Sequence, residues 1–251
     1  MRLLERISDG ELRLTPDLTK DVPSYAILSH TWGADSTEVT FHDMISGTER
    51  DKLGFKKIQF CIDQAQRDGL QFCWVDTCCI NKDSSSELQE AINSMFRWYR
   101  GATRCYVYLS DVPGHLVSRH EWEPFFRASR WFTRGWTLQE LLAPRSVEFF
   151  AQGQRLGDRE SLLHAVHEVT GIDTAALQGR DLSQFDIKEK FQWAMTRETS
   201  REEDWAYCLL GIFGVFIPLI YGEGREHAVS RLFEVIAKRE EPGMYSSILE
   251  I

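Results

Sequence analysis

Three clusters of polar residues hold the side chains that could bind or transform a small molecule. The first runs from Ser29 to Gly33, the second from Asp76 to Asn81 and the third from Arg134 to Glu140. The first two directly follow short apolar runs typical of buried strands, and the third follows the loop after another such run. Because ligands of open parallel sheets bind outside the carboxyl ends of the strands, we expect the three clusters to line one crevice.

Several of these residues have both a functional and a structural interpretation. His30 could contact a phosphate or a ribose, or could cap its own loop by hydrogen bonding. Trp32, beside Gly33, could stack on an aromatic base or anchor the loop by packing. Asp76 could orient ribose hydroxyls or hold its loop through backbone N–H groups. The sequence leaves these alternatives open.

Cys79 and His30 together suggest a thiol nucleophile activated by a base. Against this, Cys78 and Cys79 are adjacent, so a regular strand cannot point both into one crevice, and only Asn81 is available as an orienting group. A zinc site from the same residues would lack the CxxC or HxxxH spacing that such sites normally show. We therefore predict neither a catalytic cysteine nor a bound metal.

The elements that position these clusters alternate between strands and helices over residues 21–151, which predicts an α/β fold with a mostly parallel sheet and right-handed crossovers. A capping box at Ser84–Glu87 marks the best-defined helix. Before the sheet, Asp9-Gly10 predicts a small N-terminal β-hairpin. Strands are expected at residues 25–29, 72–76, 104–109 and 146–150, and helices at 52–68, 84–99 and 136–142.

From residue 158 the pattern becomes helical only, and no Pro/Gly/Ser linker separates it from the core. We therefore expect one domain over 1–251, with a helical extension at 158–240 packed on the α/β core. In this extension we expect a buried ion pair between Arg197 and Asp204. Tyr221–Gly224 should form a tight turn with its glycines at positive φ. The expected helices are 161–170, 187–196, 202–213 and 226–238.

Charge and composition exclude several function classes. The 251 residues carry 29 Lys and Arg against 38 Asp and Glu, a net charge of −9, which argues against nucleic-acid binding. The N-terminus lacks the apolar run of a signal peptide, and the longest apolar stretch, 209–221, is too short to span a bilayer. We therefore expect a cytoplasmic protein that is not bound to a membrane, with its six cysteines reduced.

Longer motifs in the three clusters resemble the fungal heterokaryon-incompatibility (HET) domain. They are Tyr25-x-x-Leu28-Ser29-His30-x-Trp32-Gly33, Trp74-x-Asp76-x-x-Cys79-Ile80-Asn81 and Arg134-Gly135-Trp136-Thr137-Leu138-Gln139-Glu140. The resemblance continues through 197–199, 204–211 and 221–224, and covers roughly residues 2–238. It implies a role in the programmed cell death that follows fusion of incompatible fungal cells. Such domains are often fused to NOD-like nucleotide-binding receptors, but this sequence contains no GxxxxGK[ST] loop.

HET domains in turn are similar to TIR domains, several of which cleave NAD⁺. In that family a helix after the third strand carries a Trp and, four residues on, a catalytic Glu, a spacing matched by Trp136 and Glu140. Asp76 and Glu87 match the loop that enters the second main helix. The resemblance implies a TIR-like, flavodoxin-like sheet, with NAD⁺ as substrate and no cofactor. It implies the catalytic residue Glu140 and the substrate-binding residues Ser29, His30, Trp32, Gly33, Asp76, Cys79, Asn81 and Trp136.

Two functions therefore compete at this level. The first is an NAD⁺ hydrolase, active once oligomerised and with a NOD-like receptor as a candidate partner, in which Glu140 stabilises a positively charged ribosyl group. The second is a non-enzymatic death-signalling adaptor, which would need an exposed apolar surface on the extension instead of a polar crevice. For Glu140 itself, the structural alternative is a solvated helix residue or an ion pair with Arg134.

Overall fold

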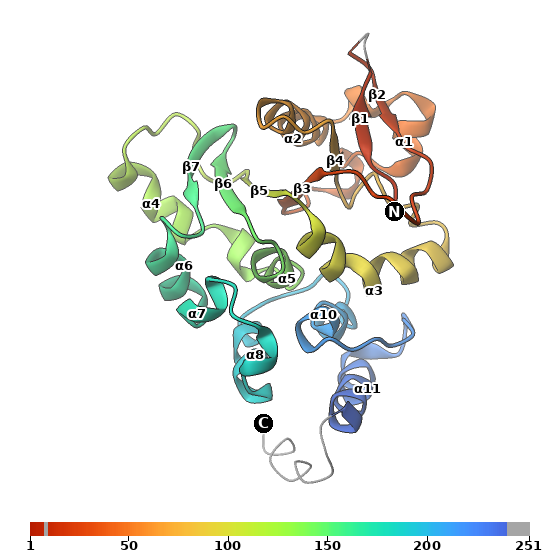
Figure 1. Cartoon of the computed structure of the whole chain (residues 1–251), viewed down its shortest axis with the longest axis vertical. Helices are drawn as coiled ribbons and strands as arrows, with labels where there is room; N and C mark the ends of the chain where they lie inside the picture. Colours follow the sequence, from red (N-terminus) through yellow and green to blue (C-terminus); the bar gives the residue numbers. More distant parts are fainter. Residues whose placement is uncertain (8–9, 240–251) are drawn as a thin grey trace.

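The computed structural model describes residues 1–7 and 10–239 and contains a seven-stranded mixed sheet (Figure 1). The central strands β4, β3, β5 and β6 are parallel, while the N-terminal hairpin and β7 pair antiparallel at the two edges. This order confirms the predicted flavodoxin-like α/β arrangement and the hairpin. In sheet order the strands are β2 (Leu12–Leu14), β1 (Leu4–Arg6), β4 (Phe72–Trp74), β3 (Tyr25–His30), β5 (Arg104–Leu109), β6 (Val147–Ala151) and β7 (Gln154–Asp158).

Helices cover the sheet and continue into the extension. Figure 1 shows α3 and α5 between the sheet and the helices α8, α10 and α11. The core helices are α1 (Phe41–Ser46), α2 (Phe55–Arg67), α3 (Ser85–Gly101), α4 (Arg119–Arg127) and α5 (Thr137–Leu142). The later helices are α6 (Leu163–Thr170), α7 (Thr174–Leu177), α8 (Ile187–Met195), α9 (Asp204–Tyr207), α10 (Leu210–Phe213) and α11 (Gly224–Arg239). Among the described residues, no helix combines the length and apolar character needed to cross a bilayer.

Helix α3 begins at the predicted position, but its cap differs from the expected box. The Ser84 hydroxyl accepts a hydrogen bond from the backbone N–H of Glu87, which is one half of the box. The Glu87 carboxylate does not return to Ser84. It accepts from the backbone N–H of Asn81 at 2.8 Å and pairs with Arg2. The start of α3 is thereby joined to the loop after β4, so this helix fixes the second polar cluster.

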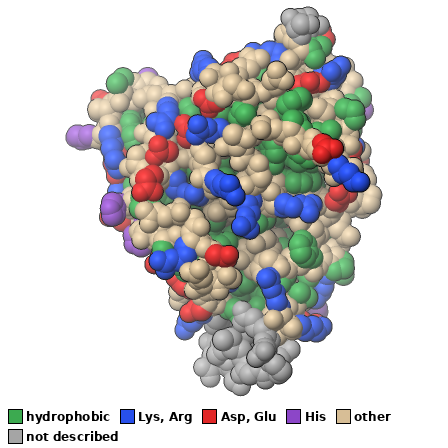
Figure 2. Space-filling model, viewed as in Figure 1, with side chains coloured by type: hydrophobic (Ala, Val, Ile, Leu, Met, Phe, Trp, Pro, Cys, Tyr) green, Lys and Arg blue, Asp and Glu red, His purple; other side chains and the backbone are tan. Residues whose placement is uncertain are grey.

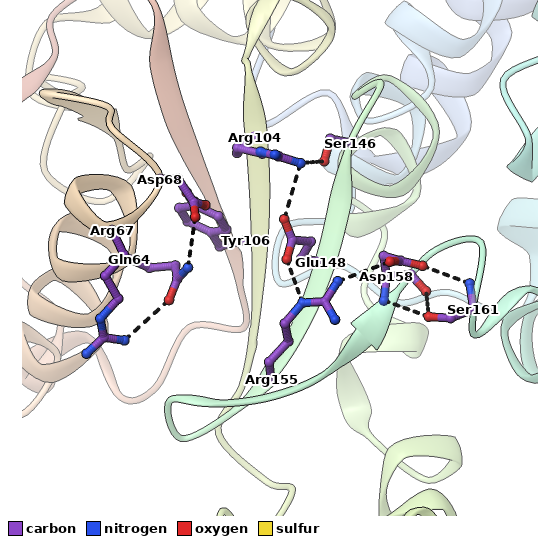
Figure 3. A network of polar contacts seen from close by, with 10 residues as sticks. All are labelled: Gln64, Arg67, Asp68, Arg104, Tyr106, Ser146, Glu148, Arg155, Asp158 and Ser161. Atoms are coloured by element: carbon purple, nitrogen blue, oxygen red, sulfur yellow. Dashed lines mark hydrogen bonds and ion pairs between the residues drawn. The ribbon is translucent and has the colours of Figure 1, made fainter.

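An ionic network supports the far edge of the sheet (Figure 3). Glu148 on β6 pairs with Arg104 of β5 at 3.5 Å and with Arg155 of β7 at 2.7 Å. Arg155 also reaches Asp158 at 3.0 Å. The sequence analysis missed β7 because its residues, Gln-Arg-Leu-Gly-Asp, show no apolar alternation. The edge strand is stabilised by charge pairing across its solvent-facing side.

The helical extension packs against α3 at a glycine. A Cβ placed on Gly211 of α10 would lie 2.1 Å from the Cβ of Phe96 and 2.4 Å from its Cγ. Real side chains do not tolerate such distances, so only glycine allows α10 to pack this closely on α3. The contact sets how near the extension lies to the core.

We predict that Gly211→Ala lowers the free energy of unfolding by about 2 kcal/mol, because the added methyl forces α10 away from α3. Chemical denaturation monitored by circular dichroism measures the change. Phe216→Ala is the control, since Phe216 is 72% exposed and its truncation should change stability by no more than about 0.5 kcal/mol. Equal stability of Gly211→Ala and the unmodified chain would contradict this packing.

Candidate active site

A cavity of about 330 Å³ lies between the carboxyl ends of the parallel strands and the helical extension. It brings together residues from all three sequence clusters, as expected for this edge of the sheet. The extension supplies a further wall that the sequence analysis did not foresee. The core side contributes His30, Trp32, Asp76, Lys82, Trp136 and Glu140, and the extension contributes Ser200, Arg201, Asp204 and Tyr221.

Glu140 lies in α5 with only 5% of its surface exposed. The hydroxyl of Ser29, at the end of β3, donates a hydrogen bond to its Oε2 atom. The indole N–H of Trp131 donates to the Ser29 hydroxyl at 2.8 Å, which holds that hydroxyl in place. Ser29 therefore acts on the cavity through Glu140, because its own side chain is fully buried behind the wall.

Burial, followed by the nearby charge of Asp76, raises the pKa of Glu140 to about 8. Hydrogen bonds from Ser29 and Tyr99 and the charge of Arg197 act in the opposite direction without reversing the shift. Glu140 is thus mostly protonated at neutral pH in the empty cavity. The Arg134 guanidinium is not its partner, since that group donates to Ser200 at 2.8 Å.

Asp76, His30 and Trp32 form a second polar group opposite Glu140. The indole N–H of Trp32 donates to Asp76 Oδ2 at 2.9 Å, and His30 Nε2 lies 3.8 Å from Asp76 Oδ1. Burial, followed by the charges of Lys57 and Lys82, lowers the pKa of His30 well below its usual value, so the ring is neutral. Burial raises the pKa of Asp76. Both His30 Nε2 and Asp76 Oδ1 are buried without a hydrogen-bond partner among the described residues. Such atoms normally meet water or a ligand.

The ammonium group of Lys82 lies 3.6 Å from the centroid of the Trp32 ring. This cation–π contact covers one face of the indole. Trp32 as a whole remains 42% exposed despite this contact. Sequence reasoning missed Lys82 because one lysine in a polar loop gives no signal of its own.

Asp204 is the central residue of the cavity wall that the extension contributes. This carboxylate accepts from the indole N–H of Trp136 at 3.2 Å and from the Tyr221 hydroxyl at 2.9 Å. Burial raises the pKa of Asp204 despite these two bonds. The Arg201 guanidinium stacks 4.2 Å from the Tyr221 ring centroid, and both side chains face the cavity. Asp204 and Tyr221 stand in motifs that the sequence analysis singled out, but their approach to the first cluster depends on tertiary packing.

The predicted ion pair between Arg197 and Asp204 is wrong. Arg197 donates to the backbone carbonyl of Arg134 and to the Thr137 hydroxyl, both at 2.9 Å, and so holds the start of α5. Burial lowers its pKa to about 10. The expected turn at Tyr221–Gly224 is confirmed, with Gly222 at φ 100° and Gly224 at φ 77°.

Besides Ser29, three predicted site residues lie outside the cavity wall. Cys79 is 2% exposed, and its sulfur accepts from the backbone N–H of Val75. The side-chain oxygen of Asn81 accepts from the backbone N–H of Asp83 at 3.2 Å, which closes its own loop. The backbone N–H of Gly33 donates to Glu38 at 2.5 Å, in a buried pair with Lys57. These residues shape the loops instead of facing a ligand.

Within the described parts of the chain, no cluster of three or more His, Cys, Asp or Glu side chains could hold a metal ion. All six cysteines are buried free thiols. The side chains that line the cavity include carboxyl groups, a neutral imidazole, aromatic rings and the cations Lys82, Arg134 and Arg201.

The sequence of the chain is similar to that of known proteins. The profile of the family described as Heterokaryon incompatibility protein (HET) matches residues 25–118. The chain is also 56% identical over 243 residues to Vegetative incompatibility protein HET-E-1 of Podospora anserina. That alignment covers 95% of this chain but only 18% of the relative's length. No solved structure matches the chain.

We predict that Glu140→Gln stabilises the fold in a pH-dependent way. The folded carboxyl keeps its proton up to about pH 8, while the unfolded chain releases it near pH 4.5, so the free energy of unfolding falls as pH rises between these values. Glutamine does not ionise, so the Glu140→Gln variant lacks this fall in the free energy of unfolding. Its advantage should be near zero at pH 4 and on the order of 3 kcal/mol at pH 8, measured by denaturation at each pH. A pH-independent difference would show that Glu140 ionises normally.

Proposed function

Because this chain belongs to the heterokaryon incompatibility family, we propose that it serves as the cell-death effector domain of a fungal incompatibility protein. The name of its Podospora relative supports the role in vegetative incompatibility. We further propose that the domain acts by hydrolysing NAD⁺ to nicotinamide and ADP-ribose. The observation that carries this second step is the buried Glu140 carboxyl, facing a cavity whose other wall holds unpaired polar atoms.

The charge pattern of the cavity suits a ligand that is positive at one end and negative at the other. Glu140, Asp76 and Asp204 all have raised pKa values because they are buried, and a cation among them would favour their ionised forms. The nicotinamide ring of NAD⁺ carries such a charge. The side chains of Arg134 and Arg201 line the same cavity and could meet the pyrophosphate.

The size of the cavity fits part of the substrate. Ligand pockets usually measure about 300–1,000 Å³, and this one, at about 330 Å³, is large enough for the nicotinamide riboside half. The exposed part of Trp32 offers a stacking surface for an aromatic ring at the edge of the cavity. We place the adenosine half of the dinucleotide outside the enclosed space.

The reaction needs one ionised carboxylate. When the bond between ribose C1′ and the nicotinamide nitrogen breaks, its electron pair leaves with the nitrogen, and nicotinamide departs neutral without a general acid. The ribosyl group becomes an oxocarbenium ion, which the Glu140 carboxylate stabilises. Water then attacks C1′ and gives its proton to Glu140. The balance is NAD⁺ plus water to ADP-ribose, nicotinamide and a proton.

Regulation and partners are also proposals. A toxin of this kind must stay inactive in a healthy cell, so we propose that self-association completes the site. The chain spans only 18% of its relative, so regions outside it could carry the upstream signal. We propose a NOD-like receptor as the partner that brings copies together, with no role for nucleic acid or membrane.

One observation favours the adaptor alternative. Large apolar side chains of the extension are exposed, with Phe216 at 72%, Met195 at 62% and Ile220 at 49%. Exposed apolar groups can mark a binding surface for another protein. They are also compatible with self-association of an enzyme, and an adaptor does not need the buried carboxyls of the cavity. We therefore keep the hydrolase as the principal proposal.

We predict that purified, concentrated protein releases nicotinamide from NAD⁺, and that Glu140→Gln lowers the rate by about a thousandfold or more because the oxocarbenium ion loses its carboxylate. Glutamine keeps the size of the side chain and an acceptor for Ser29. Nicotinamide is measured by chromatography, with light scattering to establish the assembled state.

The matched control is Glu90→Gln, an exposed carboxylate on α3, which should retain full activity. An assembled protein that releases no nicotinamide would overturn the hydrolase and favour the adaptor. Equal loss in both variants would show that the assay reports net charge or folding instead of Glu140.

We also predict an unusual pH profile. In the free protein Glu140 ionises at about pH 8, so kcat/KM should rise with pH through that value. Bound nicotinamide carries a positive charge that favours the carboxylate, so the pKa seen in kcat should be lower. Because the Glu140 and Asp76 carboxyl groups interact, the apparent pKa values seen in kcat/KM and in kcat describe the two carboxyl groups together. A kcat/KM that is flat from pH 6 to 9 would contradict this assignment.

A further inference from the structure

A second cavity begins where α5 ends, with Leu142 and Arg145 in its wall. It encloses about 810 Å³ between the ends of α3 and α5, the segment around α7, and the helices α10 and α11. It shares none of its lining residues with the cavity at Glu140. Its wall carries six cationic side chains, Arg100, Arg145, Arg159, Arg180, Lys190 and Arg239.

This concentration of positive charge is unexpected in a chain with a net charge of −9. Figure 2 shows Lys and Arg side chains gathered over the middle of one face, where Figure 1 places α3, α5, α8 and α10. Asp181 is the one carboxylate among the lining residues, and it accepts from the backbone N–H of Ser183 at 2.9 Å. One engaged carboxylate leaves the five arginines of the wall in excess among its charged lining residues. A concave surface with charges of one sign attracts ions of the other sign.

Arg159 is one of the two buried cations of this cavity, with 8% of its surface exposed against 6% for Lys190. Its guanidinium donates to two backbone carbonyls, those of Leu141 at 2.6 Å and Arg145 at 3.3 Å. Among the described residues it forms no ion pair within 4.0 Å. A buried guanidinium without a carboxylate has an unmet preference for an anion, because carbonyl oxygens carry only partial charge.

Arg100 and Arg180 stand at the open side of the cavity. Both are exposed, and within residues 1–7 and 10–239 neither side chain makes a hydrogen bond or an ion pair. Arg100 lies in the last turn of α3, where a cation also interacts well with the helix dipole. No helix dipole accounts for the position of Arg180, because α7 already ends at Leu177. Both side chains are available to a ligand entering from solvent.

We propose that this cavity binds a compact polyanion that carries several phosphate groups. Arginine suits that chemistry because its planar guanidinium donates two parallel hydrogen bonds to a phosphate. A concave wall with cations on several sides favours clustered phosphates over a single carboxylate. The volume accommodates a small phosphorylated molecule, and the overall negative charge of the chain disfavours a long nucleic acid.

The site is independent of NAD⁺ hydrolysis but is connected to it by α5. Arg159 holds the carbonyl of Leu141 at the end of the same short helix that carries Glu140. A phosphate bound to Arg159 would therefore act next to Leu141, the residue that directly follows Glu140. Phosphate binding itself does not require Glu140, so it can be tested whether or not the protein cleaves NAD⁺.

The test is titration calorimetry of the full chain with inorganic tripolyphosphate at low salt. Arg100→Gln/Arg180→Gln should weaken binding about tenfold or more. The control Lys56→Gln/Arg67→Gln removes two exposed cations of α2, including the one in its last turn, and should change affinity less than about twofold. Thermal melting in the same buffers gives a second readout, because a ligand that binds the folded state raises Tm.

A second arm identifies the source of the phosphates. Vesicles of phosphatidylcholine, with and without phosphatidylinositol bisphosphate, are sedimented with the protein and both double variants. Binding to the phosphoinositide vesicles that is lost only in Arg100→Gln/Arg180→Gln assigns a lipid headgroup. Tripolyphosphate binding without vesicle binding assigns a free molecule. Absent tripolyphosphate binding, or equal weakening in both double variants, overturns the proposed site.

Discussion

The burial of the Glu140 carboxyl without a cation beside it is the constraint on which the candidate site depends. Such a group keeps its proton unless something positive enters the cavity. The surrounding residues preserve this condition. Ser29 and Trp131 hold the carboxyl in position, Arg134 donates to Ser200, and Arg197 donates to the start of α5 and to Trp193 of α8. The Glu140 carboxyl therefore forms no ion pair with either arginine.

The helical extension takes part in this arrangement. Asp204 and Tyr221 close the cavity on the side where a bare flavodoxin-like sheet would open to solvent. The close approach of α10 to α3 at Gly211 limits how far that wall can move. Because these walls bury the carboxyl groups of the cavity, their charges act on one another more strongly than they would at an open strand edge. The core and the extension therefore form one functional unit.

The sequence predicted the parallel strands well because their apolar runs are continuous and end in polar clusters. It failed where the signal is nonlocal or weak. Helix α4, which contains Pro124, is not among the expected helices. The segment predicted as one helix at 202–213 divides into α9 and α10. In the site, the motif pointed to Glu140 and Asp76. The positions of Lys82 and Asp204, and the true partners of Arg197, depend on contacts that no spacing rule encodes.

The six thiols have a consequence for the fate of the protein under oxidation. Each is buried and none forms a disulfide, and burial raises the pKa of Cys105 and Cys208, which keeps them in the unreactive thiol form. Peroxide in a dying cell would therefore spare folded copies. Copies that unfold would expose six nucleophilic sulfurs at once and cross-link, so redox damage would remove misfolded molecules while intact ones persist.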